Sequence, residues 1–202
     1  MGQMSAQSNP QGSLDRRAVV ARLLAGRKDL LVITGLGSSS FDAMAAGDHD
    51  QNFYLWGAMG SAAMVGLGLA TAKPKNSVLV LTGDGEMLMG FGSLATIALR
   101  QPKNLTIAVL DNGHFGETGM QVSHTGRGVS LDQVARTCGF AWSAEIRDMA
   151  GVGDLRERLG RHDGVKFACI KIAADSPPRV LPPRDGVYLK NRFRAALGHG
   201  PI

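Results

Sequence analysis

The sequence predicts an α/β protein built on a doubly wound, mostly parallel sheet with helices on both faces. Three observations support this fold class. Short segments that are apolar at nearly every position alternate with segments of helical periodicity. Most of the apolar segments run directly into glycine-rich or polar turns. The chain has 202 residues, of which 44% are hydrophobic and 19% charged, and this composition suits one globular domain.

The first half of the chain supplies three of the predicted strands. Residues 14–26 form an amphipathic helical pattern that ends at Gly26. The stretch "DLLVITGLGSSS" is a strand that enters a Gly/Ser loop, and "FYLWGAMG" is a second strand that runs into glycine. The small-residue helix "SAAMVGLGLATA" follows, and "SVLVLT" is the third strand.

The second half continues the alternation of strands and helices. "GEMLMGFGSLATIALR" predicts a single helix over residues 85–100, "NLTIAVL" a strand, and "DNGHFGETGMQVSHTGRG" a long polar loop. Helices are expected around residues 131–138 and 155–159, with a short strand near Phe140 between them and the strand "KFACIKIA" after them. The proline-bearing "DSPPRVLPPRDG" leads to a helical stretch, "VYLKNRFRAAL".

The chain divides into three predicted parts. Residues 1–13 are a disordered lead, residues 14–175 are the α/β domain, and residues 176–202 are a Pro-rich linker with a C-terminal helical arm that covers the domain. The first residues lack the pattern of a signal peptide, and no segment reaches the roughly 18 apolar residues that span a membrane, so a cytoplasmic protein without membrane contact is expected. Cys138 and Cys169 lack metal-ligand spacing and are interpreted as core residues.

The charge pattern disfavours a nucleic-acid partner. The net charge of +5 comes from 22 basic and 17 acidic residues spread along the chain, and aromatic residues make up only 5%. Such a chain offers no aromatic platform on which bases could stack. The modest positive net charge is equally compatible with a small anionic ligand.

Four loops are expected to meet at one edge of the sheet, because the carboxyl ends of parallel strands lie together and ligands bind outside them. They are residues 34–40, 56–60, 83–86 and 111–119. Gly83-Asp84-Gly85 offers a carboxylate for a hard cation and backbone N–H groups for phosphate, although Asp84 could instead only cap a helix. Asn112 follows the next strand, 28 residues after Asp84, so its amide oxygen could reach the same Mg²⁺.

This pairing of Gly-Asp-Gly with a later asparagine resembles the cofactor motif of thiamine diphosphate enzymes. The resemblance implies that Asp84, Asn112 and the backbone carbonyl of His114 coordinate Mg²⁺. Asp111 stands before Asn112, where the family usually has a pair of asparagines.

Two further loops share the resemblance. "WGAMGSA" is similar to the segment whose backbone carbonyl, here at Gly57, contacts the aminopyrimidine, and whose apolar wedge, here Met59, lies under the cofactor. Met59 could otherwise be a core residue, and Ser38 could be a helix cap. The cofactor-binding residues implied are Thr34, Gly35, Gly37, Ser38, Gly57, Met59, Gly83, Asp84, Gly85, Glu86, Asn112, His114 and Gly116.

A dinucleotide site is the rival interpretation. Gly90, Gly92 and Ala95 fit a G-x-G-x-x-A pattern, and Asp111 lies where a ribose-binding acid would be expected. That pattern must open directly after a strand, whereas Gly90 is eight residues past Thr82. The distance of this pattern from the end of the strand therefore disfavours a dinucleotide site.

The resemblance also implies an activity and a partner. The "GETGMQ" loop and the "DGVYLKNRF" tail are similar to decarboxylases of small acidic 2-oxo acids, such as sulfopyruvate or phosphonopyruvate, which release CO₂ and an aldehyde. The chain has room for the diphosphate-binding domain alone, so a companion subunit must supply the pyrimidine-binding domain and the activating glutamate, in an α₂β₂ or larger hetero-oligomer. Alternatives are a subunit of an acetohydroxyacid synthase-like enzyme or of a 2-oxo acid oxidoreductase, and a non-catalytic regulator that binds thiamine diphosphate.

The residues that serve the substrate are less defined by the sequence. His114, Glu117 and His124 could relay a proton, although each could equally be a solvated loop residue. A second group could form a cationic lid over an acidic substrate or a charged surface. Its members are Arg127, Arg179, Arg184, Lys190, Arg192 and Arg194.

Overall fold

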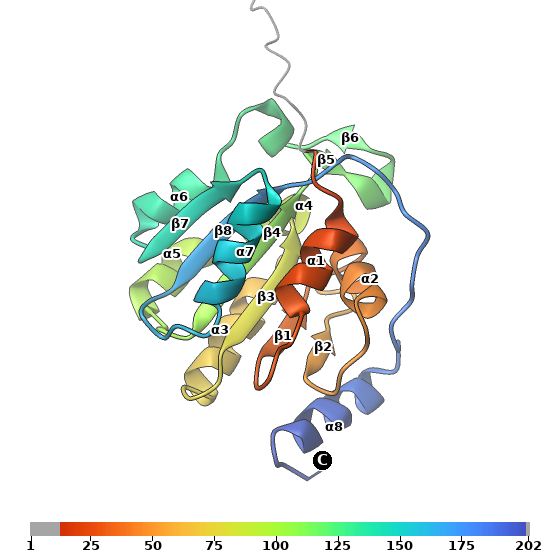
Figure 1. Ribbon diagram of the computed structural model, residues 1–202, viewed down its shortest axis with the longest axis vertical. Coiled ribbons are helices and arrows are strands. Elements are labelled where there is room, and N and C mark those ends of the chain that lie inside the picture. The colour runs from red at the N-terminus through yellow and green to blue at the C-terminus, as the bar shows by residue number, and fades with distance from the viewer. Residues whose placement is uncertain (1–12, 201–202) are drawn as a thin grey trace, which may run out of the picture.

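A computed structural model of the protein describes residues 13–200, so nearly all of the predicted N-terminal lead lies outside the described residues. The centre is a six-stranded sheet with the order β2-β1-β3-β4-β8-β7, in which every neighbouring pair is parallel (Figure 1). Its strands are β1 (Leu31–Thr34), β2 (Asn52–Tyr54), β3 (Val78–Gly83), β4 (Leu105–Asp111), β7 (Trp142–Ile146) and β8 (Lys166–Lys171). The chain moves outward from β1 to β2 and then crosses back to β3, which makes the β1/β3 boundary a topological switch point.

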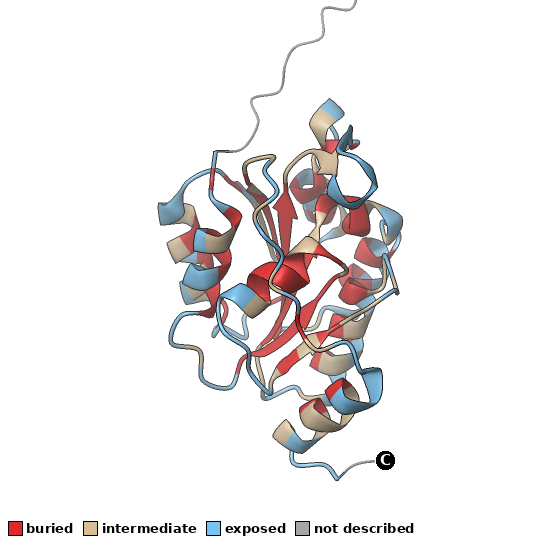
Figure 2. Cartoon of the chain, turned by 90° about the vertical axis from the view of Figure 1, so that its right-hand side faces the viewer, coloured by how far each residue is buried: buried red, intermediate tan, exposed pale blue. Residues whose placement is uncertain are grey.

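Helices cover both faces of this sheet, and this confirms the predicted fold class. Alternate strand residues pack into two separate cores, one with α3 (Ala62–Ala72), α5 (Ser93–Arg100) and α6 (Leu131–Cys138), the other with α1 (Arg16–Leu24), α2 (Ser38–Ala45) and α7 (Met149–Arg158). Figure 2 shows the sheet as a buried layer between the two sets of helices. Burial on both faces explains why the strands are apolar at nearly every position.

The single helix predicted over residues 85–100 is wrong. The structure contains a short helix α4 (Asp84–Met89), and α5 begins separately at Ser93. The break lies where the backbone of Gly90 packs against Gly60, so closely that a Cβ on Gly90 would lie 2.2 Å from the Gly60 carbonyl oxygen. This tertiary contact decides where α4 ends, and helical periodicity does not record it.

Other differences are smaller. The polar loop after β4 contains an antiparallel hairpin, β5 (His114–Phe115) with β6 (Gln121–Val122), and the 3₁₀ turns η1 (Gly116–Thr118) and η2 (Thr125–Arg127). The strand expected near Phe140 is β7, which begins two residues later. The helix expected around residues 155–159 begins earlier, because Asp148 accepts a hydrogen bond from the Gly151 N–H and caps α7.

The C-terminal arm ends in α8 (Gly186–Ala196), which packs beside β2 at the edge of the sheet (Figure 1). Phe193 is buried and meets Phe53 edge to face, with ring centroids 5.6 Å apart. Arg192 donates to the Asp48 carboxylate at 2.6 Å. These contacts fix α8 on the domain, while the division at residue 175 stays a prediction.

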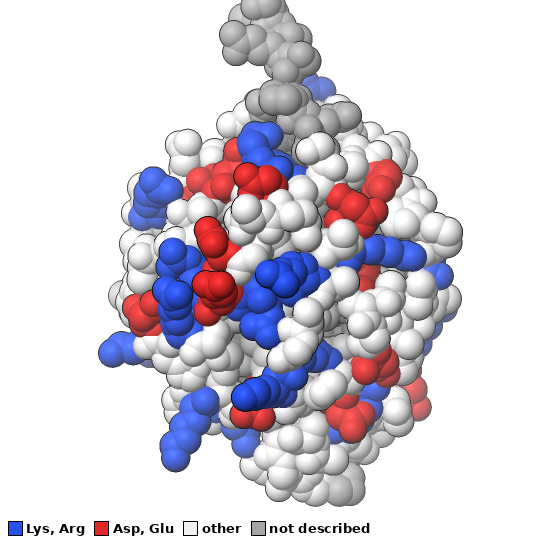
Figure 3. Space-filling model, viewed as in Figure 1, with Lys and Arg blue, Asp and Glu red and all other residues white. Residues whose placement is uncertain are grey.

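The surface agrees with the diffuse charge seen in the sequence. On the face shown in Figure 3, acidic side chains lie among the basic ones.

Across residues 13–200, no helix has both the length and the apolar character needed to cross a membrane. Both cysteines are free, Cys169 buried and Cys138 half-buried.

Candidate cofactor site

A cleft lies outside the carboxyl ends of β1, β3 and β4, at the switch point. Its volume is about 210 Å³. The first turns of α2 and α4 reach it, and β5 with the following η1 turn forms one wall. Helix N-termini at strand ends are the usual place for a phosphate in such folds.

Ten of the predicted site residues line this cleft. They are Ser38, Met59, Gly83, Asp84, Gly85, Glu86, Asn112, His114, Gly116 and Glu117. Thr34, Gly35, Gly37, Gly57 and His124 do not line it. Thr34 hydrogen-bonds Ser40 at 2.6 Å, and the His124 ring stacks edge to face on Phe115. Gly35 and Gly37 lie beside lining residues, because a Cβ on either would come within 3 Å of the Glu86 or the Glu117 carboxylate, respectively.

Asp84 is the buried acid of the cleft, with 2% of its surface exposed. Its Oδ2 accepts hydrogen bonds from the Ser123 hydroxyl at 2.5 Å and the Thr125 hydroxyl at 3.0 Å. Burial, and to a smaller extent the charge of Asp111, raise the pKa of Asp84 above its usual value. The hydrogen bonds from Ser123 and Thr125 act in the opposite direction but do not cancel this rise. The carboxylate does not cap α4, whose N-cap is Gly83 with no side-chain bond, so the capping interpretation of Asp84 is wrong.

Asn112 lies on the neighbouring strand end and lines the same cleft. Its side-chain oxygen accepts from the His114 N–H at 2.9 Å, and its backbone carbonyl lies 2.8 Å from Nδ1 of His114. The second contact requires the proton on Nδ1, which leaves Nε2 as the basic nitrogen. A carboxylate and an amide oxygen from two adjacent strand ends form a donor set of the hard oxygen type that Mg²⁺ prefers.

Glu86 joins the loops around the cleft. Its Oε2 accepts from the Thr82 hydroxyl at 2.8 Å and from the Leu36 N–H at 3.1 Å, and its Oε1 accepts from the Ala62 N–H at 3.4 Å. Gly35 makes room for this carboxylate, since a Cβ there would lie 1.5 Å from Oε2. Burial raises the pKa of Glu86, and the three hydrogen bonds oppose the rise.

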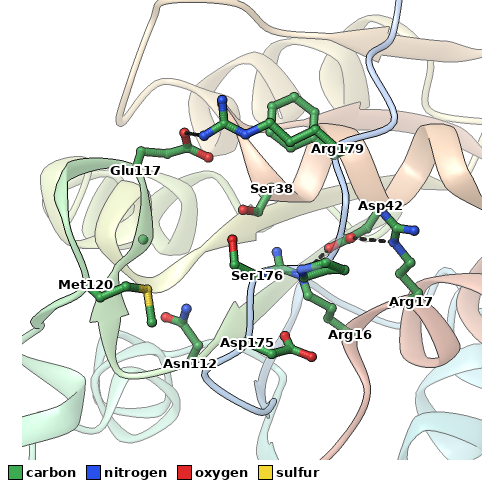
Figure 4. A pocket seen from close by; sticks show the side chains of 13 residues that line it. Arg16, Arg17, Ser38, Asp42, Asn112, Glu117, Met120, Asp175, Ser176 and Arg179 are labelled. Carbon is green, nitrogen blue, oxygen red and sulfur yellow. Dashed lines mark hydrogen bonds and ion pairs between the residues drawn. The ribbon is translucent and has the colours of Figure 1, made fainter.

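A smaller polar pocket of about 30 Å³ adjoins the cleft (Figure 4). Arg16 donates to Asp42 at 2.6 Å, and Arg179 of the C-terminal segment donates to Glu117 at 3.1 Å. Sequence reasoning did not single out Arg16, although it also lines the main cleft. The basic groups around this pocket are therefore paired with acids.

The other arginines considered for a lid have different positions. Arg192 pairs with Asp48, Arg184 lies over the Trp56 ring at 5.5 Å, and Arg194 donates to a backbone carbonyl. None of these three lines the cleft or the smaller pocket.

Comparison with known proteins identifies the family to which the chain belongs. The thiamine pyrophosphate enzyme family, in its C-terminal TPP-binding domain, matches residues 35–166. The chain therefore belongs to the family of thiamine diphosphate enzymes, as the sequence motif predicted.

Three individual proteins narrow the comparison. The chain is 43% identical over 192 residues to the phosphonopyruvate decarboxylase of Streptomyces viridochromogenes, covering 92% of this chain and 47% of that protein. It is 40% identical over 115 residues to the sulfopyruvate decarboxylase subunit beta of Methanocaldococcus jannaschii, covering 57% of this chain and 60% of that protein.

The crystal structure of benzoylformate decarboxylase from Polynucleobacter necessarius matches with a TM-score of 0.65 at 17% identity, over 88% of this chain and 36% of that one. At that identity the likeness supports the fold. The chain thus spans about half to three fifths of the length of the two relatives that it matches by sequence.

Proposed function

We propose that this chain is the diphosphate-binding subunit of a two-subunit, Mg²⁺-dependent decarboxylase of small acidic 2-oxo acids. The observation that carries the proposal is that Asp84 and Asn112, from neighbouring strand ends, both line one cleft at the switch point of the sheet. The names of the relatives support decarboxylation of sulfopyruvate or phosphonopyruvate. Both are 2-oxo acids with a second acidic group.

The residues of this chain would hold the cofactor by its diphosphate end. Asp84, Asn112 and the His114 carbonyl would coordinate Mg²⁺, and the first-turn N–H groups of α2 and α4 would donate to the diphosphate. Met59 would support the cofactor from the wall of the cleft. Bound thiamine diphosphate supplies the electron sink that decarboxylation of a 2-oxo acid requires.

Proton transfer is assigned first to His114. Its Nδ1–H is directed to the Asn112 carbonyl, so Nε2 is the atom that can hold or release a proton in the cleft. Glu117 stands at the rim in its ion pair with Arg179, and His124 supports the wall through Phe115. The glutamate that activates the cofactor would come from the companion subunit, in an α₂β₂ or larger assembly.

Cofactor retention in the presence of Mg²⁺ tests the proposal. The Asp84→Ala variant should lose Mg²⁺-dependent retention of thiamine diphosphate, measured by calorimetry with the companion present. Asp132→Ala is the matched control, because Asp132 is also a buried acid but lies on α6 outside the cleft. Equal retention by wild type and Asp84→Ala would remove the metal assignment.

Substrate assays test the reaction. The reconstituted pair should release CO₂ from sulfopyruvate or phosphonopyruvate and far less from pyruvate. If the pair prefers pyruvate, or transfers electrons to an acceptor and forms no aldehyde, the decarboxylase assignment is wrong.

A further inference from the structure

A buried group of side chains behind Asp84 connects it to a strand that contributes no predicted site residue. The centre of the group is the Asp111 carboxylate, which has four donor groups within hydrogen-bond distance. Its Oδ1 accepts from the Thr125 hydroxyl at 2.8 Å and the Gly113 N–H at 2.9 Å. Its Oδ2 accepts from the Lys171 ammonium at 2.5 Å and the Cys169 thiol at 3.2 Å.

Lys171 is the counter-ion of Asp111. The two residues are direct neighbours across β4 and β8, and their side chains are 12% and 0% exposed. An ionised carboxylate at such a site is strongly unfavourable without a paired cation. Lys171 therefore supplies the paired cation that the buried Asp111 carboxylate requires.

Thr125 connects this ion pair to Asp84. Its hydroxyl lies between the two carboxylates, 2.8 Å from Oδ1 of Asp111 and 3.0 Å from Oδ2 of Asp84, and its single proton is shared between these two acceptors. Ser123 adds a second hydroxyl to the same Oδ2 of Asp84. Two hydroxyls on one oxygen restrict rotation of the Asp84 carboxylate.

The ion pair involves only one of the two carboxylates in this group. Lys171 contacts Asp111 directly. Glu145 lies 3.8 Å from the Lys171 ammonium, but it is 32% exposed and its charge is screened by solvent. Asp84 has no ion pair among the described residues, and it is the carboxylate of the group that lines the cleft.

We propose that Lys171, Asp111 and Thr125 are positioning residues for the divalent cation of the cleft. Thr125 orients the Asp84 carboxylate, Asp111 holds Thr125 and, through the Gly113 N–H, the loop that carries Asn112, and Lys171 fixes Asp111. The inference rests on the proposed function for the identity of the ligand. The inference extends the proposed metal site to residues that do not coordinate the cation themselves but hold the coordinating groups in place.

Titration with Mn²⁺ tests the role of Thr125. Free Mn²⁺ is followed by electron paramagnetic resonance, with thiamine diphosphate and the companion subunit present. Thr125→Val should weaken Mn²⁺ binding by roughly 10- to 100-fold, the usual effect of losing a group that orients a metal ligand. Thr125→Ser, which keeps the hydroxyl, should restore binding to within about threefold.

The matched control is Thr106→Val. Thr106 is about as buried as Thr125, but it lies near the start of β4, at the opposite end of the strand from Asp111. Near-wild-type Mn²⁺ affinity in Thr125→Val, with binding lost in Asp84→Ala, would overturn the positioning role and leave the proposed function intact. Absence of specific Mn²⁺ binding in the wild type would overturn the proposed function, and with it the metal role of this group.

Thermal unfolding without metal or cofactor tests the ion pair independently. Lys171→Met leaves a buried, unpaired carboxylate and should lower the melting temperature by about 10 °C. Adding Asp111→Asn removes that charge but keeps an oxygen for Thr125, so the double variant should recover most of the loss. If Lys171→Met is as stable as wild type, or if the second substitution restores nothing, Lys171 does not hold Asp111 in the way proposed.

Discussion

Replacing Glu86 tests whether one buried carboxylate holds the first loops of the cleft together. Glu86 is 5% exposed and accepts hydrogen bonds from Thr82, Leu36 and Ala62. Glu86→Ala leaves all three donors without their acceptor. An unsatisfied buried donor costs about 1–3 kcal/mol, while the alanine variant also avoids burying a carboxylate. We therefore expect a net loss of about 3 kcal/mol in the free energy of unfolding.

The assay is thermal and urea unfolding of the cofactor-free chain. For a chain of this length, a loss of about 3 kcal/mol corresponds to a decrease of roughly 6–12 °C in melting temperature. Glu86→Gln keeps the shape and one acceptor oxygen, so we expect about half of that loss. Glu157→Ala is the control, because Glu157 is exposed on α7 and its loss should change the stability by less than about 0.5 kcal/mol.

The pH dependence follows from the raised pKa of Glu86. The folded protein keeps this proton at a pH where the unfolded chain has lost it, so the contribution of Glu86 is largest below the unfolded pKa of about 4.3. It decreases as the pH rises through the folded pKa. The stability difference between wild type and Glu86→Gln should therefore narrow as the pH rises toward neutrality. Wild-type stability in Glu86→Ala, or a difference that widens with pH, would refute this reasoning.

Two further predictions concern packing elsewhere in the domain, at the Gly60–Gly90 contact and at the contact of α8 with the edge of the sheet. Gly90→Ala should cost about 2–3 kcal/mol, because its Cβ would lie 2.2 Å from the carbonyl oxygen of Gly60, whereas Gly92→Ala, with no atom within 4 Å, should be neutral or slightly stabilising. If Gly90→Ala and Gly92→Ala change the free energy of chemical unfolding equally, the close approach of Gly90 to Gly60 is contradicted. Hydrogen bonds from Arg192 and Tyr54 lower the pKa of Asp48 although burial opposes this, so Arg192→Met should lose about 1 kcal/mol near neutral pH. That loss should disappear as the pH falls below about 4, and a loss independent of pH would show that Asp48 is not involved.

The class of fold and the place of the site are readable from the sequence because both depend on local patterns. A strand covered on both faces is apolar at nearly every position, as "SVLVLT" and "NLTIAVL" are. Parallel strands bring their carboxyl ends to one edge, so Asp84 and Asn112 could be placed together before any coordinates.

Tertiary structure alone decided how these residues are supported. Lys171 meets Asp111 across 60 residues and Thr125 meets Asp84 across 41, and both contacts depend on strand order and register. The approach of Gly60 to Gly90 likewise divides a segment whose periodicity favours one helix. Local periodicity records which side of an element is buried, whereas hydrogen bonds and ion pairs between distant residues exist only once the sheet has assembled.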